Sequence, residues 1–285
     1  MTISPAMPAP HGLTLVVPAP AKVNLFLHVT GRRADGYHEI ESLFALVDLC
    51  DTITLAARDD GAIVRENDVA GVAQDDDLAV RAARALQREA NAERGVTLRV
   101  AKRIPMGAGL GGGSSDAASV LLALNRLWAL GWPRARLAAL ARTLGADVPF
   151  FVEGVNAVAR GIGDLLTPVT LPTRWLVIVH PPAHVPTADV FASPHLTRDT
   201  PSAKMDVFSE GYGRNDLAAV TAAKFPQVAD ALRVPEARMT GSGASVFMSF
   251  PARRGAEEAM AAMPRLGEIH LARTLARHPL ASFAR

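Results

Sequence analysis

Cysteine is almost absent from this sequence, because Cys50 is the only one among 285 residues. A single cysteine can form neither a disulfide within the chain nor a cysteine-based metal cage, which fits a reducing compartment. Long apolar runs are missing too, since the longest, at 117–124, is far below the roughly 18 residues that a membrane span needs. The sequence therefore predicts a cytoplasmic protein that does not enter a membrane.

An export signal is also lacking. Residues 1–20 carry five prolines and no basic residue before a hydrophobic stretch, which is typical of a disordered lead-in rather than a signal peptide. We assign residues 1–17 to this Pro-rich lead-in.

Charge of one sign is not in excess, because 30 Lys and Arg face 28 Asp and Glu. The basic residues are scattered, so nucleic-acid binding is not expected despite a pI of about 9.0. Hydrophobic residues make up 49% of the chain, which indicates a globular protein. Its length allows one large domain or two of moderate size.

The pattern of apolar residues predicts a mixture of strands and helices. Alternation along 22–29 indicates a half-buried strand, and Asp35-Gly36 indicates a hairpin reversal into a second strand at 40–47. The remaining expected elements are helices at 75–90, 117–130, 134–144, 216–224 and 255–263, and strands at 96–102, 150–152, 155–159, 175–179 and 245–250. This order favours an α+β fold, with an N-terminal domain at 18–165 and a C-terminal domain at 166–285.

Five glycines lie between Gly107 and Gly113, followed by two serines and a strongly helical stretch. Backbone amides of glycine can approach an anion closely, and a helix N-terminus attracts negative charge, so a phosphate site is predicted. The alternative is a flexible linker or a tight turn. A dinucleotide loop is excluded because no acidic residue occurs at 117–146, and a Walker A loop because no lysine follows the glycines. Protein-kinase motifs are absent as well.

Three motifs of the chain together resemble those of a known family. The run from Pro105 to Ser115 resembles the phosphate-binding motif of the GHMP kinase superfamily, while residues 20–25 and 240–245 resemble its N-terminal and C-terminal motifs. The resemblance implies the two-domain GHMP kinase fold, with Mg-ATP as co-substrate and no tightly bound cofactor. ATP and the acceptor would bind in the cleft between the domains. It assigns to ATP binding Pro105, Met106, Gly107, Ala108, Gly109, Leu110, Gly111, Gly112, Gly113, Ser114 and Ser115, together with Asp77 and Lys102.

Motifs at 34–38, 111–115 and 144–149 are closer to one branch of this superfamily, whose acceptor is a cytidylated methylerythritol of the non-mevalonate isoprenoid route. The alternatives are a homoserine or phosphomevalonate type of kinase and a catalytically silent nucleotide sensor. The resemblance indicates no partner beyond the small-molecule substrate and ATP, and the oligomeric state stays open.

Phosphoryl transfer needs a base for the attacking hydroxyl and positive charge nearby. In the family the residue that matches Asp147 is the base, and Lys22 matches its partner. By period-two geometry Lys22 shares a strand face with Asn24. Without the resemblance, Asp147 would be interpreted as a helix N-cap and Lys22 as a solvated strand residue.

A cytidine acceptor needs a stacking platform and a reader for the edge of the base. The resemblance assigns these roles to Tyr37, His38 and Phe191, and it adds Asn24 and Thr187 to the acceptor site. Taken alone, Phe191 would be a core residue and His38 an ordinary loop histidine. The C-terminal glycine motif contributes Gly241, Ser242 and Gly243.

Two acidic residues differ from some relatives, which have asparagine there. Asp77 begins the helix beside the expected adenine pocket, so its contact with the base is in question. Asp116 is expected to point outward from the first helical turn and to stabilise the helix dipole. Ser115 is the predicted magnesium ligand.

Overall fold

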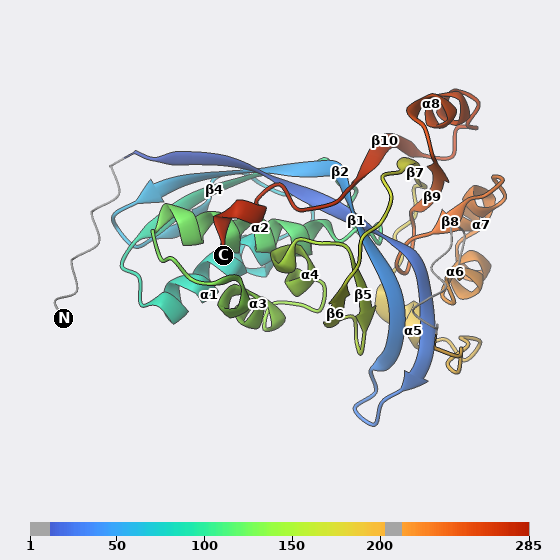
Figure 1. Cartoon of the computed structure of the whole chain (residues 1–285), viewed down its shortest axis with the longest axis horizontal. Coiled ribbons are helices and arrows are strands. Elements are labelled where there is room, and N and C mark those ends of the chain that lie inside the picture. The colour runs from blue at the N-terminus through green and yellow to red at the C-terminus, as the bar shows by residue number, and fades with distance from the viewer. Residues whose placement is uncertain (1–11, 203–212, 285) are drawn as a thin grey trace.

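The computed structural model of this chain describes residues 12–202 and 213–284. A long antiparallel hairpin, β1 (Thr14–Arg32) and β2 (His38–Arg58), runs across the whole molecule (Figure 1). It reverses at Asp35-Gly36, where Gly36 has a φ of +90° that side chains disfavour. The expected hairpin is thus confirmed. The strand begins at Thr14, before the domain start expected at residue 18, while residues 1–11 of the expected lead-in lie outside the described residues.

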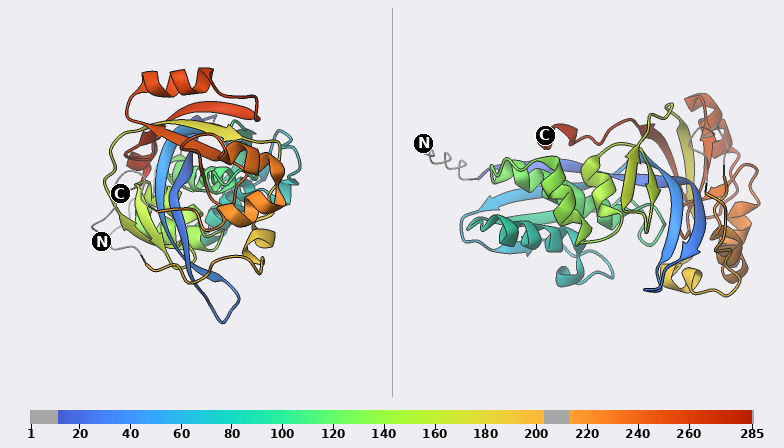
Figure 2. Two further views of the ribbon diagram at one scale, coloured as in Figure 1. Left: turned by 90° about the vertical axis from the view of Figure 1, so that its right-hand side faces the viewer. Right: turned by 60° about the horizontal axis from the view of Figure 1, so that its bottom comes forward.

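One half of the molecule is a sheet with helices packed on one face (Figure 1; Figure 2, right). The innermost helix is α2 (Gly112–Leu127), and 12 of its 16 residues are buried, which explains why its sequence is apolar on all sides. Besides β1, β2 and α2, the elements are β3 (Ile63–Arg65), β4 (Gly95–Ala101), β5 (Ala157–Arg160), β6 (Leu165–Pro168), α1 (Leu78–Ala90), α3 (Arg134–Arg142) and α4 (Val148–Glu153).

The other half is built on the continuation of the same ten-stranded sheet, in which β10 pairs with β2 and the order runs on as β10-β7-β9-β8. Side chains alternate along β7, so Val177 and Val179 enter the core beneath the helices while Leu176 and Ile178 face the hairpin. The elements are β7 (Trp175–His180), β8 (Arg238–Met239), β9 (Val246–Phe250), β10 (Glu268–Leu275), α5 (Thr187–Phe191), α6 (Ala218–Lys224), α7 (Pro226–Leu232) and α8 (Arg253–Ala261).

The two halves are interleaved along the chain. Leu27 and Val29 of β1 belong to the core of the second half, whereas Leu280 and Ala284 return to the core of the first. The C-terminal end accordingly lies against the helices of the first half in Figure 1. The division near residue 165 stays a prediction.

Two expectations about local structure were wrong. The segment 150–152 is not a strand but part of α4, which has Pro149 in its first turn and Gly154 in a left-handed conformation at its end. The helix expected from residue 117 begins already at Gly112, so the last glycines of the loop form its first turn. Within the residues that the structure describes, no helix is long and apolar enough to cross a membrane.

Candidate active site

The three motifs singled out in the sequence meet at one point. The amide of Lys22 donates to the carbonyl of Leu110 at 3.0 Å, which joins β1 to the glycine-rich loop. The amide of Asn24 donates to the hydroxyl of Thr240 at 2.9 Å, and that of Ser245 donates to the carbonyl of Ala108 at 3.3 Å. Segments far apart in the sequence therefore form one continuous wall.

The glycine-rich loop approaches the C-terminal glycine motif backbone to backbone. Gly109 has a φ of +74°, and a Cβ atom there would overlap the carbonyl oxygen of Thr240. Gly241 is equally close, because its Cβ would lie 2.9 Å from the Cα of Gly109. Only glycine fits this contact, so the two motifs depend on each other.

A cavity lies on each side of this loop. The larger, of about 850 Å³, is lined by residues from both halves, including Lys22, Asp147 and Phe191. The smaller, of about 390 Å³, is lined by residues 105–114 with Asp77, Lys102 and Asp116. Gly109, Gly111 and Ser114 belong to both walls. A phosphate chain held on the loop can thus enter from one cavity and reach a group bound in the other.

Lys22 and Asp147 face each other in the larger cavity, with the Lys22 Nζ atom 3.5 Å from Asp147 Oδ2. Lys22 is only 4% exposed, donates to Asn24 Oδ1 at 2.6 Å and lies over the ring of Phe44. Asp147 occupies the N-cap position of α4, but its side chain makes no capping hydrogen bond. Its carboxylate is therefore free for the ion pair and for a ligand.

The far end of the larger cavity carries aromatic side chains. The rings of His38 and Phe191 are 5.0 Å apart at an angle of 31°, and Tyr37, which is 63% exposed, lines the same space. The hydroxyl groups of Thr187 and Ser242 lie 2.7 Å apart and link α5 to the C-terminal glycine motif. The structure thus brings together every residue predicted for the acceptor, with Asn24 beside Lys22.

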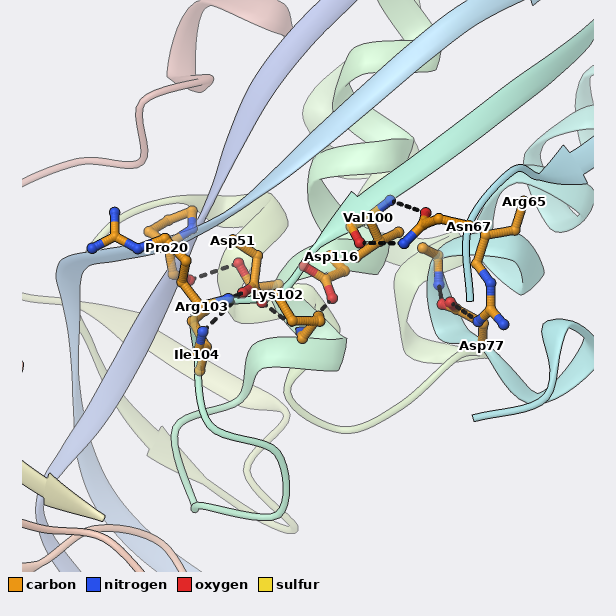
Figure 3. Close-up of polar contacts among 12 residues, drawn as sticks. Pro20, Asp51, Arg65, Asn67, Asp77, Val100, Lys102, Arg103, Ile104 and Asp116 are labelled. Atoms are coloured by element: carbon orange, nitrogen blue, oxygen red, sulfur yellow. Dashed lines mark hydrogen bonds and ion pairs between the residues drawn. The ribbon is translucent and has the colours of Figure 1, made fainter. Parts of the chain in front are cut away.

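The smaller cavity has a charged end. The Lys102 ammonium donates to Asp51 at 2.5 Å and to Asp116 at 2.7 Å, as Figure 3 shows. Asp51 is fully buried and also accepts from the amides of Arg103 and Ile104. Lys102 is thereby fixed at the start of the loop.

Asp116 was expected to point outward, and this was wrong. It is 4% exposed because α2 begins at Gly112, which places Asp116 in the second turn, where it contacts Lys102, rather than at the exposed end. Burial raises the pKa of Asp116; Lys102 opposes this shift and Asp51 adds to it. Its Oδ1 atom is buried without a hydrogen-bond partner in the part of the chain that the structure covers.

Asp77 is engaged inside the protein. One of its oxygens accepts from the amide of Ala79 and caps α1, and the other accepts from Arg65 at 2.7 Å (Figure 3). Each oxygen of the carboxylate already accepts a hydrogen bond inside the protein, which does not favour a further contact with an adenine base. That contact stays a prediction.

Known proteins with similar sequences are kinases. Residues 77–155 match the family described as GHMP kinases N terminal domain. A 4-diphosphocytidyl-2-C-methyl-D-erythritol kinase from Thiobacillus denitrificans is 55% identical over 93% of this chain and 97% of its own length. One of the same name from Cupriavidus metallidurans is 49% identical over the full length of both chains. This chain belongs to that kinase family.

Solved structures agree with the family. The crystal structure of a 4-(cytidine 5'-diphospho)-2C-methyl-D-erythritol kinase superposes with a TM-score of 0.75, at 36% identity over 91% of this chain and 99% of the other. A homoserine kinase from Cytophaga hutchinsonii has a TM-score of 0.67 at 16% identity, covers 98% of each chain and shows the fold alone. The expected GHMP kinase fold and enzyme class, an ATP-dependent phosphotransferase, are confirmed.

The sequence analysis missed several residues of this kinase site. Asp51 was overlooked because it lies in a strand with no motif. Arg198, which donates to His38 Nε2 at 3.0 Å, was overlooked because a single arginine in a loop carries no signal. Arg32 lines the larger cavity from the end of β1. Ser115 was singled out, but it is fully buried, donates its hydroxyl to the carbonyl of Pro20 and lines neither cavity.

Proposed function

We propose that this chain transfers the γ-phosphoryl group of ATP to the 2-hydroxyl of 4-diphosphocytidyl-2-C-methyl-D-erythritol, giving the 2-phosphate and ADP in the non-mevalonate route to isoprenoid precursors. The observation that carries the proposal is the pair of cavities on either side of one phosphate loop. The larger cavity holds an aromatic end that suits a cytosine base and a Lys–Asp pair that suits a reacting hydroxyl.

In this proposal Asp147 takes the proton of the acceptor hydroxyl while its oxygen attacks the γ-phosphorus and ADP departs. Lys22 holds the carboxylate in place through their 3.5 Å ion pair and offsets the negative charge that spreads over the transferred group. Asn24 fixes the direction of the Lys22 ammonium through their 2.6 Å hydrogen bond. Amides of the loop and the N-terminus of α2 bind the phosphates of ATP.

Magnesium is part of the proposal as the ion of Mg-ATP, and it would neutralise charge on the phosphates. Magnesium usually keeps water and phosphate oxygens and takes only one or two protein carboxylates. Asp116, which lines the smaller cavity, supplies a carboxylate of the kind that magnesium takes. Ser115 remains the predicted ligand, and its hydroxyl would have to share its contact with Pro20.

We further propose that the enzyme works in the cytoplasm with no resident cofactor and binds no nucleic acid. The single cysteine and the scattered basic residues support this.

The test is ADP release by the purified protein with Mg-ATP and four separate acceptors. These are the cytidylated methylerythritol, homoserine, phosphomevalonate and uncytidylated methylerythritol phosphate. Turnover with the first alone is expected. Turnover with homoserine or phosphomevalonate would keep the phosphate loop and discard the cytosine site, whereas no turnover with any acceptor would favour a nucleotide sensor.

A further inference from the structure

Arg198 joins the two elements that carry the aromatic side chains of the larger cavity. Its Nε atom donates to His38 Nε2 at 3.0 Å. Its Nη2 atom donates to the carbonyl of Phe191 at 3.0 Å and to that of Ser193 at 2.7 Å, and its Nη1 atom donates to that of Leu196. The guanidinium is thus fixed by several bonds, and the position of His38 follows from it.

The direction of the Arg198–His38 bond determines where the imidazole carries its proton. An arginine N–H group can only donate, so His38 Nε2 must accept and can carry no hydrogen. A neutral imidazole that accepts at one nitrogen carries its proton on the other, which here is Nδ1. No hydrogen bond from the described residues reaches Nδ1, and His38 lines the larger cavity.

The charges around His38 favour the same neutral form. Burial lowers the pKa of His38, and the guanidinium groups of Arg198 and Arg32 lower it further. Among the described residues no carboxylate contributes to this shift, and the ring that packs against His38 is the uncharged one of Phe191. His38 therefore presents one fixed donor to a ligand near neutral pH.

Cytosine and uracil differ at the ring nitrogen N3. In cytosine N3 is an acceptor, whereas in uracil it carries a hydrogen and is a donor. A fixed Nδ1–H donor forms a hydrogen bond with the first base and meets another donor in the second. A site built to make a hydrogen bond rejects the analogue that cannot make it, because its own polar group is left unpaired.

We propose that Arg198 is a positioning residue that holds His38 as the Nδ1–H tautomer, and that this tautomer selects a cytosine base over uracil. The proposal rests on the proposed function for its substrate, but its statement about the tautomer does not depend on turnover.

The first test is the tautomer itself, read from proton–nitrogen correlation spectra of the uniformly nitrogen-labelled protein. The His38 signal is identified among the eight histidines by its loss in His38→Asn. We expect the proton on Nδ1 in the unmodified protein and a shift of the population towards Nε2–H in Arg198→Met. A proton on Nε2 in the unmodified protein would overturn the proposal, and this readout needs no variant of Arg198 to fold.

The second test is the ratio of kcat/KM for the cytidylated acceptor to that for the same acceptor built on uridine. Arg198→Met should lower this ratio about 10-fold or more, which corresponds to the loss of one hydrogen bond. Arg32→Met is the matched control, because it removes an equal charge near His38, and among the described residues the Arg32 side chain has no hydrogen bond to the His38 ring. It should change both acceptors by the same factor.

An equal fall for both acceptors in Arg198→Met would mean that Arg198 only holds the Phe191 loop, and it would overturn the proposal. Absence of turnover with the cytidylated acceptor in the unmodified protein would instead overturn the proposed function and the selectivity with it. The spectra would still decide the tautomer, so the two failures are distinguishable.

Discussion

Asp147 stands at the start of a helix without acting as its cap. Its backbone occupies the N-cap position of α4, but its carboxylate lies 3.5 Å from the Lys22 ammonium and makes no capping bond. Capping bonds usually stabilise a helix by about 1 kcal/mol. Giving up this contribution leaves an acceptor oxygen in the cavity, which is the arrangement that a general base requires.

Replacing Asp147 by Asn tests this role at the scale of one residue. The amide keeps the shape but cannot take a proton, so kcat should fall by about 10²- to 10⁴-fold while ATP affinity is retained. Single-turnover kinetics and nucleotide titration separate the two effects. An unchanged turnover rate would remove Asp147 from the mechanism.

Tyr37 lines the aromatic end of the larger cavity, where we propose that the acceptor binds, and is 63% exposed, so its ring is available to a ligand. Tyr37→Ala should weaken binding of the cytidylated acceptor by about 1 to 3 kcal/mol, the usual contribution of stacking on one base. ATP binding should be unaffected, and calorimetric titration of both ligands provides the check. Loss of ATP affinity instead would reverse our assignment of the two cavities.

At the scale of elements, the glycine-rich loop and the C-terminal glycine motif form one packed unit. The contact runs through backbone atoms at Gly109 and Gly241, which leaves no flexible side chain to move aside. The same loop continues directly into α2, whose buried surface anchors it to the first half. A change at this contact should therefore affect both stability and the phosphate site.

Gly109→Ala is the corresponding variant. The added Cβ meets the Thr240 carbonyl, and alanine would be strained at the left-handed φ of +74° that Gly109 has. We therefore expect a loss of at least about 1 kcal/mol in stability and weaker ATP binding. Thermal unfolding with and without ATP measures both. Gly255→Ala in α8 is the control, since its Cβ would lie 3.6 Å from the Phe250 ring and alanine favours a helix by about 0.5 to 1 kcal/mol. Equal unfolding temperatures for the two variants would contradict the packing argument.

At the scale of the whole molecule, the C-terminal segment, residues 276–284, follows the second half in sequence but packs against the first half. Arg134 of α3 donates to the carbonyls of Val152, Ala281 and Ala284, and so joins the end of α4 to the last described residues. The amide of His278 donates to the carbonyl of Gly154 at 2.8 Å. The helix that follows Asp147 is thus fixed at its far end by this segment.

His278 makes this closure sensitive to acid. Burial, helped by Arg134, lowers the pKa of His278 to about 3 in the folded protein, compared with 6.5 for a free side chain. The unfolded chain binds the proton first, so stability is complete above about pH 6.5 and falls as the pH drops, by up to about 1.4 kcal/mol per unit.

Denaturant unfolding between pH 4 and 8 measures this dependence. The amide of Leu280 donates to His278 Nδ1 at 3.0 Å. The asparagine of His278→Asn also offers an acceptor to this amide, but its side chain does not titrate. The stability of this variant should fall less steeply with acid than that of the unmodified protein. Parallel curves would show that His278 is not the group responsible.

Sequence alone determined the family and predicted the phosphate loop and the pairing of Lys22 with Asp147, because these depend on local patterns such as the glycines of 107–113 and the Gly-Ala-Asp turn before Pro149. It also predicted the central hairpin, since alternation and Asp35-Gly36 act over a few residues. The segment 150–152 was misjudged because its apolar run fits a buried strand or a buried helix equally well, and only packing decided between them.

Tertiary structure alone decided which side chains meet. Asp51 and Asp116 reach Lys102 from other elements, and Arg198 reaches His38 across 160 positions of the chain. The burial of Asp116 followed from where α2 begins, which the composition of the loop did not fix. Contacts between distant segments depend on how whole elements pack, and the charge and tautomer of each site residue depend on those contacts in turn.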